Sequence, residues 1–276
     1  MRVRDEANAH QAAARASGLG ESGSIGSVQI LYLPGFRLGA TVWAMTSRYG
    51  QFCPVAVASE IFAERWTPII LRELVLGSRR FNEIHRGVPR ISRALLAKRL
   101  RDLAAARVIE STDGEYRLTE AGIELGEIVK SLGVWGARWT APVQRDRLDA
   151  RLLTWDMRRR FDVERLPEKR VVMRLDFGGI PAGNRAPRTY WFVLERPEVD
   201  LCLFEPGFEV DLFVYADLAS FAKVWLGDLP MRQAIREGGI KLSGSREAVR
   251  DFPSWLLLST LAAVPRPAVS IQRRVA

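Results

Sequence analysis

The sequence is poor in the residues from which metal and disulfide sites are built. Its 276 residues include only two cysteines and two histidines. Cys53 and Cys202 lie far apart in the chain and form neither a disulfide framework nor a metal-ligand cluster, and His10 and His85 are too few for a multi-histidine metal site within one chain. We therefore expect no metal and no cofactor, and a reducing cytoplasm as the compartment.

Long apolar runs are also missing from the sequence. No stretch of about 18 apolar residues occurs, so no transmembrane helix is predicted. The first residues are polar and rich in alanine and glycine, unlike the apolar centre of a secretory signal. The sequence has no Gly-rich phosphate loop and no nucleophile–histidine arrangement that its two histidines would serve. We therefore expect that the protein is not an enzyme.

Positive charge is what the sequence has in excess, and most of it lies in one segment. Residues 65–107 hold eleven Lys/Arg against three Asp/Glu, a net charge of +8, while the whole chain has a net charge of +9. The phosphate backbone of duplex DNA attracts such concentrated charge, and arginine can also bind base edges bidentately. An anionic membrane surface attracts cations too, and bulk charge alone does not separate these two partners.

Composition and hydrophobic periodicity divide the chain into five parts. Residues 1–44 have weak periodicity and a Gly/Ser cluster, which is typical of a disordered extension. Residues 45–142 are predicted to form a first domain, and residues 143–170 a connector whose first half is helical. Residues 171–264 are predicted to form a second domain, followed by a tail at 265–276. The expected fold class is α+β.

Signals for helix starts and stops recur through the first domain: a proline in a first turn, side-chain caps, and glycines at the ends. They predict four short helices, then a β-hairpin that turns at Asp113-Gly114, then a long helix. A helix–turn–helix followed by such a hairpin is a winged helix-turn-helix. The short helices are predicted at about 54–62, 67–76 with Thr67 as N-cap, 80–86 and 92–106 with Ser92 as N-cap, and the long helix at about 119–140.

The fourth predicted helix has a face suited to the major groove of DNA. At about 100° per residue, Leu96, Leu100 and Leu103 form its core stripe, and small residues lie beside cations on the opposite face. Alanines allow a close approach within a groove about 12 Å wide, while lysine and arginine reach phosphates or guanine edges. Contacts are also expected from arginines around the preceding helix and turn, and from the wing. The predicted DNA-binding residues are Ser92, Arg93, Ala94, Ala97, Lys98 and Arg101 on this helix, Arg79, Arg80, Arg86 and Arg90 before it, and Arg117 on the wing.

Short motifs with regular spacing run through this domain. They include Cys53-Pro54-Val55, Arg65-Trp66-Thr67, residues 70–74, residues 80–84, Ile91-Ser92 and residues 118–122. With these motifs, residues 53–140 resemble the HxlR family of bacterial winged-helix transcriptional regulators. The resemblance implies a homodimer bound to an inverted repeat, with its two recognition helices about 34 Å apart.

The same resemblance implies that the first helix and the helix after the wing build the dimer interface. The latter helix carries an apolar stripe of Ile128, Leu132, Trp135 and Trp139, which is too apolar to face water alone. Packing of this stripe within one subunit is the alternative.

Cys53 lies where some members of the HxlR family carry a thiol or electrophile sensor near the start of the first helix. A helix N-terminus and nearby arginines would lower the pKa of such a thiol. Cys-Pro also occurs as plain structure in relatives, and no second cysteine lies nearby in the sequence to form a disulfide within the chain. Both roles stay open.

The second domain alternates between strand and helix signals. Strands are predicted at 171–177, 189–195, 199–205 and 209–215, with the last two forming a hairpin around Pro206-Gly207. Helices at 218–226 and 231–237, a strand at 240–243 and a final helix at 253–262 follow.

Motifs between Val224 and Leu256 resemble the end of sterol-carrier-protein-like domains, in which a sheet and helices surround an apolar tunnel. The resemblance implies an apolar ligand as a candidate effector. A filled core is the alternative. The aromatic residues that either arrangement would use are Trp191, Phe192, Phe204, Phe208, Phe213, Phe221, Trp225 and Trp255.

The leading prediction is a sequence-specific transcriptional regulator whose partners are double-stranded DNA and a second copy of the chain, with no membrane. The alternative is a lipid carrier or membrane-surface protein that uses the basic segment to hold anionic lipid. Salt-sensitive binding to duplex DNA with a strong sequence preference would exclude the alternative.

Overall fold

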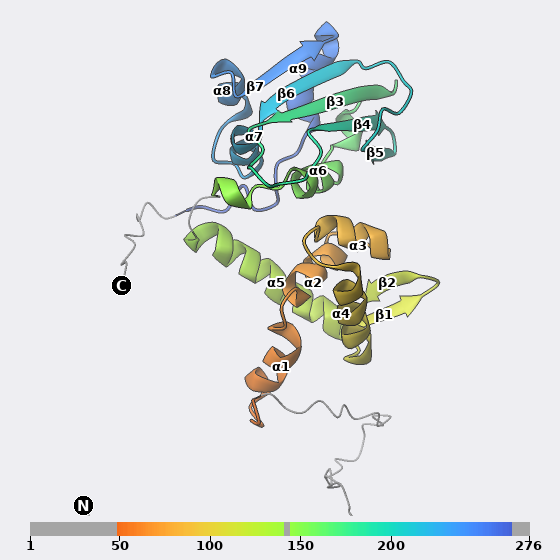
Figure 1. Cartoon of the computed structure of the whole chain (residues 1–276), viewed down its shortest axis with the longest axis vertical. Coiled ribbons are helices and arrows are strands. Elements are labelled where there is room, and N and C mark those ends of the chain that lie inside the picture. Colours follow the sequence, from red (N-terminus) through yellow and green to blue (C-terminus); the bar gives the residue numbers. More distant parts are fainter. Residues whose placement is uncertain (1–48, 141–143, 267–276) are drawn as a thin grey trace, which may run out of the picture. The chain divides into compact units, whose positions relative to one another are not determined.

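The computed structural model describes residues 49–140 and 144–266, and Figure 1 shows the arrangement of their elements. Two hydrophobic cores are present: one extends from Ile70 to Val129 and the other from Leu148 to Leu256. The predicted extension at 1–44 and most of the predicted tail lie outside the described residues. Within the described ranges, no helix combines the length and the apolar character that a membrane span requires.

The first core belongs to a winged helix-turn-helix, as predicted. Leu96, Leu100 and Leu103 are buried in it, so the predicted register of the fourth helix is confirmed. The elements are α1 (Pro54–Phe62), α2 (Thr67–Val75), α3 (Phe81–Gly87), α4 (Arg93–Ala105), the antiparallel strands β1 (Ile109–Thr112) and β2 (Glu115–Leu118), and α5 (Glu120–Trp139).

Local capping and turn chemistry explains where these elements begin. Ser92 Oγ accepts a hydrogen bond from the amide of Leu95 at 3.2 Å, and Thr119 Oγ1 accepts one from the amide of Gly122 at 3.2 Å. Asp113 and Gly114 have φ values of 54° and 76°, the left-handed pair that a two-residue hairpin turn requires. These predicted starts and the predicted turn are confirmed.

The prediction that Thr67 caps α2 is wrong. The N-cap is Trp66, which has a left-handed φ of 81° and makes no side-chain capping bond. Because the chain turns at Trp66, Thr67 takes the first helical position and is buried, with 2% of its surface exposed.

The second core lies between a five-stranded sheet and a set of helices, which agrees with the predicted α+β class (Figure 1). The strand order is β5-β4-β3-β6-β7; β3 pairs with β6 in parallel and the other neighbours are antiparallel. The elements are η1 (Arg145–Arg147), α6 (Ala150–Arg158), η2 (Val163–Arg165), β3 (Val171–Gly178), β4 (Thr189–Glu195), β5 (Glu198–Cys202), β6 (Leu212–Asp217), α7 (Leu218–Trp225), α8 (Met231–Arg236), β7 (Ile240–Gly244) and α9 (Arg246–Trp255).

Two predictions for this region are wrong. The strands around Pro206-Gly207 do not form a hairpin: β5 pairs with β4, and β6 crosses to the other side of β3. Alternation within a strand identifies its buried face but not its neighbour. The final helix is predicted at 253–262, but the last described helix, α9, begins after Ser245 and ends at Trp255. Its early start is fixed by Ser245 Oγ, which accepts a hydrogen bond from the amide of Ala248 at 3.1 Å.

The candidate ligand-lining aromatics do not gather at one place. Phe192, Phe221, Trp225 and Trp255 are buried in the second core, on the side of the sheet that the helices cover. Trp191 and Phe213 are half-buried and project from the opposite side of their strands. Phe204 is 84% exposed and Phe208 is 43% exposed. The prediction that these eight aromatics line one ligand site is therefore wrong. Alternation along the strands and an exposed loop place them on different surfaces.

Candidate nucleic-acid interface and its buried support

The solvent-facing side of α4 carries the residues predicted to read DNA. Arg93, Ala94, Lys98 and Arg101 are exposed, and Ala97 is half-buried beside them. The leucine stripe anchors the other side of α4 in the first core. The helix therefore presents small residues and long cations together on one accessible face, which is the surface that a major groove accommodates.

Arg93 is held in place by the preceding helix. Its Nη2 donates to Asn82 Oδ1 at 2.9 Å, and its guanidinium carbon lies 5.0 Å from the centroid of the Phe81 ring. Both partners are uncharged, so the positive charge of Arg93 is oriented without being neutralised. The sequence reading missed Asn82, which lies eleven positions before Arg93 and comes close only through the turn between α3 and α4.

Two acidic side chains lie among the predicted DNA-contacting cations. Asp102 Oδ2 is 2.8 Å from Lys98 Nζ. Glu115 pairs with Arg117 at 2.9 Å and with Arg80 at 3.7 Å. Arg101 forms no ion pair with any residue in the described ranges. Arg93 and Arg101 are therefore the cations on this face whose charge no described acid pairs with.

Three of the arginines placed before α4 contact the protein itself. Arg79 is half-buried, and its Nη1 donates to the carbonyl oxygen of Leu74 at 2.8 Å. The Arg86 guanidinium carbon lies 5.4 Å from the centroid of the Trp155 ring. Arg90 Nε is 3.9 Å from Asp149 Oδ2. Arg86 and Arg90 thus contact the predicted connector, a placement that the sequence did not indicate.

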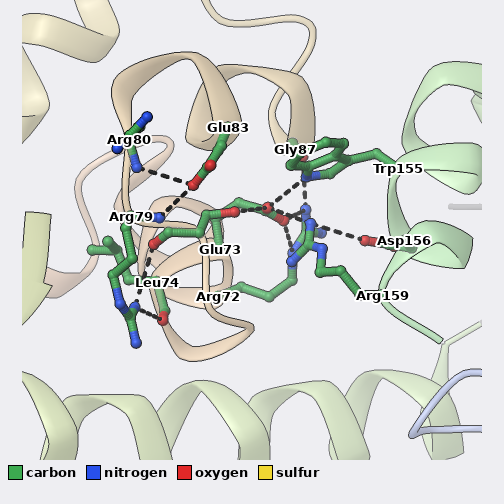
Figure 2. A network of polar contacts seen from close by, with 11 residues as sticks. Arg72, Glu73, Leu74, Arg79, Arg80, Glu83, Gly87, Trp155, Asp156 and Arg159 are labelled. Carbon is green, nitrogen blue, oxygen red and sulfur yellow. Dashed lines mark hydrogen bonds and ion pairs between the residues drawn. The ribbon is translucent and has the colours of Figure 1, made fainter. Parts of the chain in front are cut away.

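A fully buried carboxylate supports the helix-turn-helix from behind (Figure 2). Glu73 on α2 accepts hydrogen bonds from Arg72 Nη2 at 2.8 Å and from Ser78 Oγ at 3.1 Å. It also accepts hydrogen bonds from Trp155 Nε1 on α6 at 3.2 Å and from Arg159 Nη2, just past the end of α6, at 2.6 Å. A buried charge needs such pairing because its desolvation is costly.

Gly87 allows this cluster to close. A Cβ atom added there would lie 1.9 Å from Glu73 Cδ, so only glycine leaves room for the carboxylate. The carbonyl oxygen of Gly87 also accepts a hydrogen bond from Arg72 Nη2 at 2.8 Å. The end of α3 is thereby fixed to α2.

Asp156 lies at the edge of the Glu73 cluster (Figure 2). Its Oδ1 is 3.5 Å from Arg159 Nη2. Burial raises the pKa of Asp156 to about 6, and the charge of Glu73 adds to the rise, while Arg72 and Arg159 oppose it. The cluster therefore contains a group that titrates in the mildly acidic range.

α6 connects the two cores. Trp155 and Arg159 reach Glu73, whereas Leu153 and Met157 are buried in the second core. This amphipathic arrangement has apolar packing on one side and a charged cluster on the other. The sequence predicted a helical connector but not that it completes the support of the helix-turn-helix.

The predicted dimer stripe on α5 faces solvent in the single chain. Ile128, Leu132, Trp135 and Trp139 are 52%, 47%, 58% and 45% exposed. α1 contains no buried residue, and its Val55 is 73% exposed. The described residues cover each of these side chains only in part, so packing within one subunit leaves about half of the stripe exposed.

Cys53 is exposed at the N-cap of α1. The amides of Ala56 and Val55 lower the pKa of its thiol below the ordinary value, and slight burial opposes them. The Cys53 side chain makes no capping hydrogen bond. Cys202 on β5 is half-buried, and burial raises the pKa of its thiol. The structure describes no group of three or more His, Cys, Asp or Glu side chains suited to holding a metal.

Comparison with known proteins identifies the first region. Residues 61–144 match the HxlR-like helix-turn-helix family. YvaP, an HTH-type transcriptional regulator of Bacillus subtilis, is 31% identical over 100 residues, which cover 33% of this chain and 93% of YvaP. YodB, another HTH-type transcriptional regulator of B. subtilis, is 30% identical over 98 residues, covering 33% of this chain and 88% of YodB. The solved structure of quinone-bound YodB covers 30% of this chain and 96% of that chain, with 32% identity and a TM-score of 0.29.

Proposed function

Because the chain belongs to the HxlR family of helix-turn-helix transcriptional regulators, we propose that it binds an inverted-repeat operator in double-stranded DNA as a homodimer. In this proposal α4 enters the major groove, with Arg93 and Arg101 at base edges or phosphates and Lys98 at the backbone. Arg80 and Arg117 approach the flanking phosphates. The observation that carries the proposal is the accessible face of α4, on which Arg93 is held by uncharged partners.

The dimer is supported by the exposed stripe on α5 together with the unburied α1. Two tryptophans at about half exposure are costly in water and well suited to a buried interface, where large aromatic side chains carry much of the binding energy. A twofold dimer would place two copies of α4 on successive turns of one face of DNA. As a regulator of this family, the protein would act at the chromosome, in the cytoplasm.

The proposal is tested by selecting duplexes from a random library with the full chain. We expect one palindromic consensus, and we expect Arg93→Ala and Arg101→Ala to weaken binding to it by about 10-fold or more. Arg232→Ala, which removes the same charge at an exposed position on α8, is the matched control. Selection of no consensus would sink the operator proposal. Stronger retention on phosphatidylglycerol vesicles than on DNA would favour the lipid-binding alternative.

Dimer formation has its own test. Trp135→Asp places a charge in the centre of the proposed interface, so we expect the chain to run as a monomer in sedimentation and to lose cooperative binding to the palindrome. Lys130→Asp lies on the same helix at an exposed position and serves as the control for the added charge. A wild-type chain that sediments as a monomer at micromolar concentration would contradict the dimer.

An effector that binds beyond the helix-turn-helix is the second part of the proposal. The aromatic set does not enclose one site, but a hollow of about 580 Å³ lies between η1 and α7. Its lining includes the apolar residues Leu148, Ala222 and Leu226, and also Arg145 and Lys223, which have no ion-pair partner in the described ranges. The acids in the wall are engaged elsewhere: Asp217 caps α7 and Asp228 pairs with Arg266.

This lining suits a small apolar molecule with an anionic head. Octanoate is a direct probe: we expect it to raise the melting temperature and to change operator affinity, and Lys223→Glu to remove both effects. The coupling route would be α6, which follows η1 and holds Glu73 through Trp155 and Arg159. Octanoate that shifts neither the melting temperature nor the affinity would contradict this part.

Thiol sensing by Cys53 is a second candidate function, favoured by its exposure and lowered pKa. The relative YodB has been solved with a quinone bound, which makes a quinone the appropriate electrophile to test. We expect benzoquinone to weaken DNA binding of the wild type but not of Cys53→Ser. Equal loss in both proteins would eliminate the sensor and leave Cys53 a structural residue.

A further inference from the structure

The turn before α4 lies against a second basic surface that is contributed by later parts of the chain. A hollow of about 480 Å³ is lined by Pro89 and Arg90 from this turn, by Asp146 in η1, by Asp149 and Arg151 at the start of α6, and by the loop between β3 and β4. The hollow is therefore at the N-terminal end of α4, which begins only three residues after Arg90. That end of a recognition helix is the one that meets DNA.

The β3–β4 loop is held firmly at this position. Asn184 Nδ2 donates to the carbonyl oxygen of Leu148 at 3.0 Å, and Asn184 Oδ1 accepts from the amide of Ala186 at 2.9 Å. Arg151 Nη2 donates to the carbonyl oxygen of Arg185 at 2.9 Å. These bonds tie the loop to the connector and leave the side chain of Arg185 exposed.

The charge on these two segments is one-sided. Residues 145–151 and 178–188 together contain five arginines and two aspartates, a net charge of +3. One of the two, Asp149, caps α6 and also pairs with Arg90. Arg185 and Arg188 are exposed and have no ion-pair partner in the ranges that the structure describes. A surface of this kind, next to the end of a recognition helix, complements the phosphates of duplex DNA.

We propose that Arg185 and Arg188 bind phosphates of the DNA that flanks the sequence read by α4. The region beyond the helix-turn-helix would then lengthen the DNA site on each side of the operator. These contacts carry no sequence information, but they fix position and add affinity. The inference rests on the proposed function, because it requires that α4 lies on duplex DNA.

The test compares two duplexes that share one selected operator, a 20-bp duplex limited to the palindrome and a 40-bp duplex with flanks of arbitrary sequence. Wild-type chain is expected to bind the 40-bp duplex about 10-fold more tightly. The double variant Arg185→Ala/Arg188→Ala is expected to lose this advantage. It should also lower the slope of log K against log salt on the 40-bp duplex by about 4, since each subunit of the dimer loses two phosphate contacts and each contact contributes about 0.9.

Arg232→Ala/Arg236→Ala is the matched control, because both arginines are exposed on α8 and the charge change is the same. The control should retain the wild-type length dependence, and both variants should melt at the wild-type temperature. Equal affinity of the wild type for the two duplexes, or equal losses in the two double variants, would overturn the inference while leaving operator recognition intact. Failure of the wild type to bind either duplex would instead remove the proposed function and this inference with it.

Discussion

The outer face of α4 and the Glu73 cluster are both built from arginines of the same charged segment, yet they serve opposite purposes. Arg93 and Arg101 are exposed, and their charge is not cancelled by any described acid. Arg72 is turned inward to a carboxylate with no exposed surface, and Arg159 reaches the same carboxylate from the connector. Distance from an acid and from solvent, not residue type, decides whether an arginine binds a partner or stabilises the fold.

The comparison predicts that substitutions in the Glu73 cluster lower the stability of the fold far more than substitutions at exposed positions. Glu73→Ala leaves Arg72 and Arg159 without their shared acceptor, so we expect a loss of about 3–5 kcal/mol in the free energy of unfolding. Urea denaturation of the full chain measures the loss. Glu110→Ala, at an exposed position, should change stability by less than about 0.5 kcal/mol. Similar losses in the two variants would show that the cluster does not support the fold.

A second prediction concerns the pH dependence of the same cluster. The folded pKa of Asp156 is about 6, above its ordinary value of 3.8, so the folded chain holds this proton more tightly than the unfolded chain. The stabilising contribution is therefore complete below about pH 4 and is lost as the pH rises through 6. The free energy of unfolding changes by about 2–3 kcal/mol at most, because 24% of the Asp156 side chain is exposed and solvent screens its charge.

Asp156→Asn should remove this pH dependence and make the chain more stable than wild type above pH 6. Melting temperatures recorded from pH 4 to pH 8 measure the effect. The exposed Asp146→Asn is the control and should follow the wild-type profile. A parallel profile in Asp156→Asn would rule out Asp156 as the titrating group.

On the exposed side, Arg93→Ala should reduce operator affinity by about 10- to 100-fold and change the unfolding free energy by less than about 1 kcal/mol. Arg99→Ala on the same helix should do the reverse: Arg99 is 13% exposed and pairs with Glu64 and Asp102, so stability falls first. Fluorescence anisotropy with operator DNA and urea denaturation separate the two effects. Equal affinity losses in folded samples of both variants would contradict the distinction between Arg93, which is proposed to bind DNA, and Arg99, which stabilises the fold.

The smallest expected effect comes from an acid on the DNA-facing side. Glu115→Gln releases Arg80 and Arg117 from their ion pairs, so operator affinity should rise by about 2- to 5-fold, and the salt dependence should steepen. Stability should change little, because such exposed pairs contribute less than about 1 kcal/mol. An unchanged affinity at low salt would mean that the wing does not approach phosphates.

Much of the first region could be predicted because its signals are local. Ser92 and Thr119 cap their helices through amides three residues away, and the left-handed pair at Asp113-Gly114 closes the hairpin. The leucine stripe of α4 follows from helical periodicity alone. The prediction that Thr67 caps α2 is wrong because the N-cap lies one residue earlier, at Trp66. The sequence did not indicate that Trp66 adopts a left-handed conformation.

The second region shows what local signals cannot provide. Most strand positions followed from composition, but the pairing of β6 with β3 depends on a crossover that no short motif encodes. The eight aromatics had suitable chemistry for a ligand site, yet alternation along each strand placed Trp191 and Phe192 on opposite faces of the sheet.

The sequence by itself determined the winged helix-turn-helix, the register of α4 and the apolar stripe of α5, because each depends on spacing within one element. Only the tertiary structure decided which arginines keep their charge available. Glu73 meets Trp155, 82 positions later, and Arg159, 86 positions later, and the β3–β4 loop comes to lie beside Arg90. Ion pairs and their desolvation depend on distances of a few ångströms, and folding sets those distances between segments far apart in the chain.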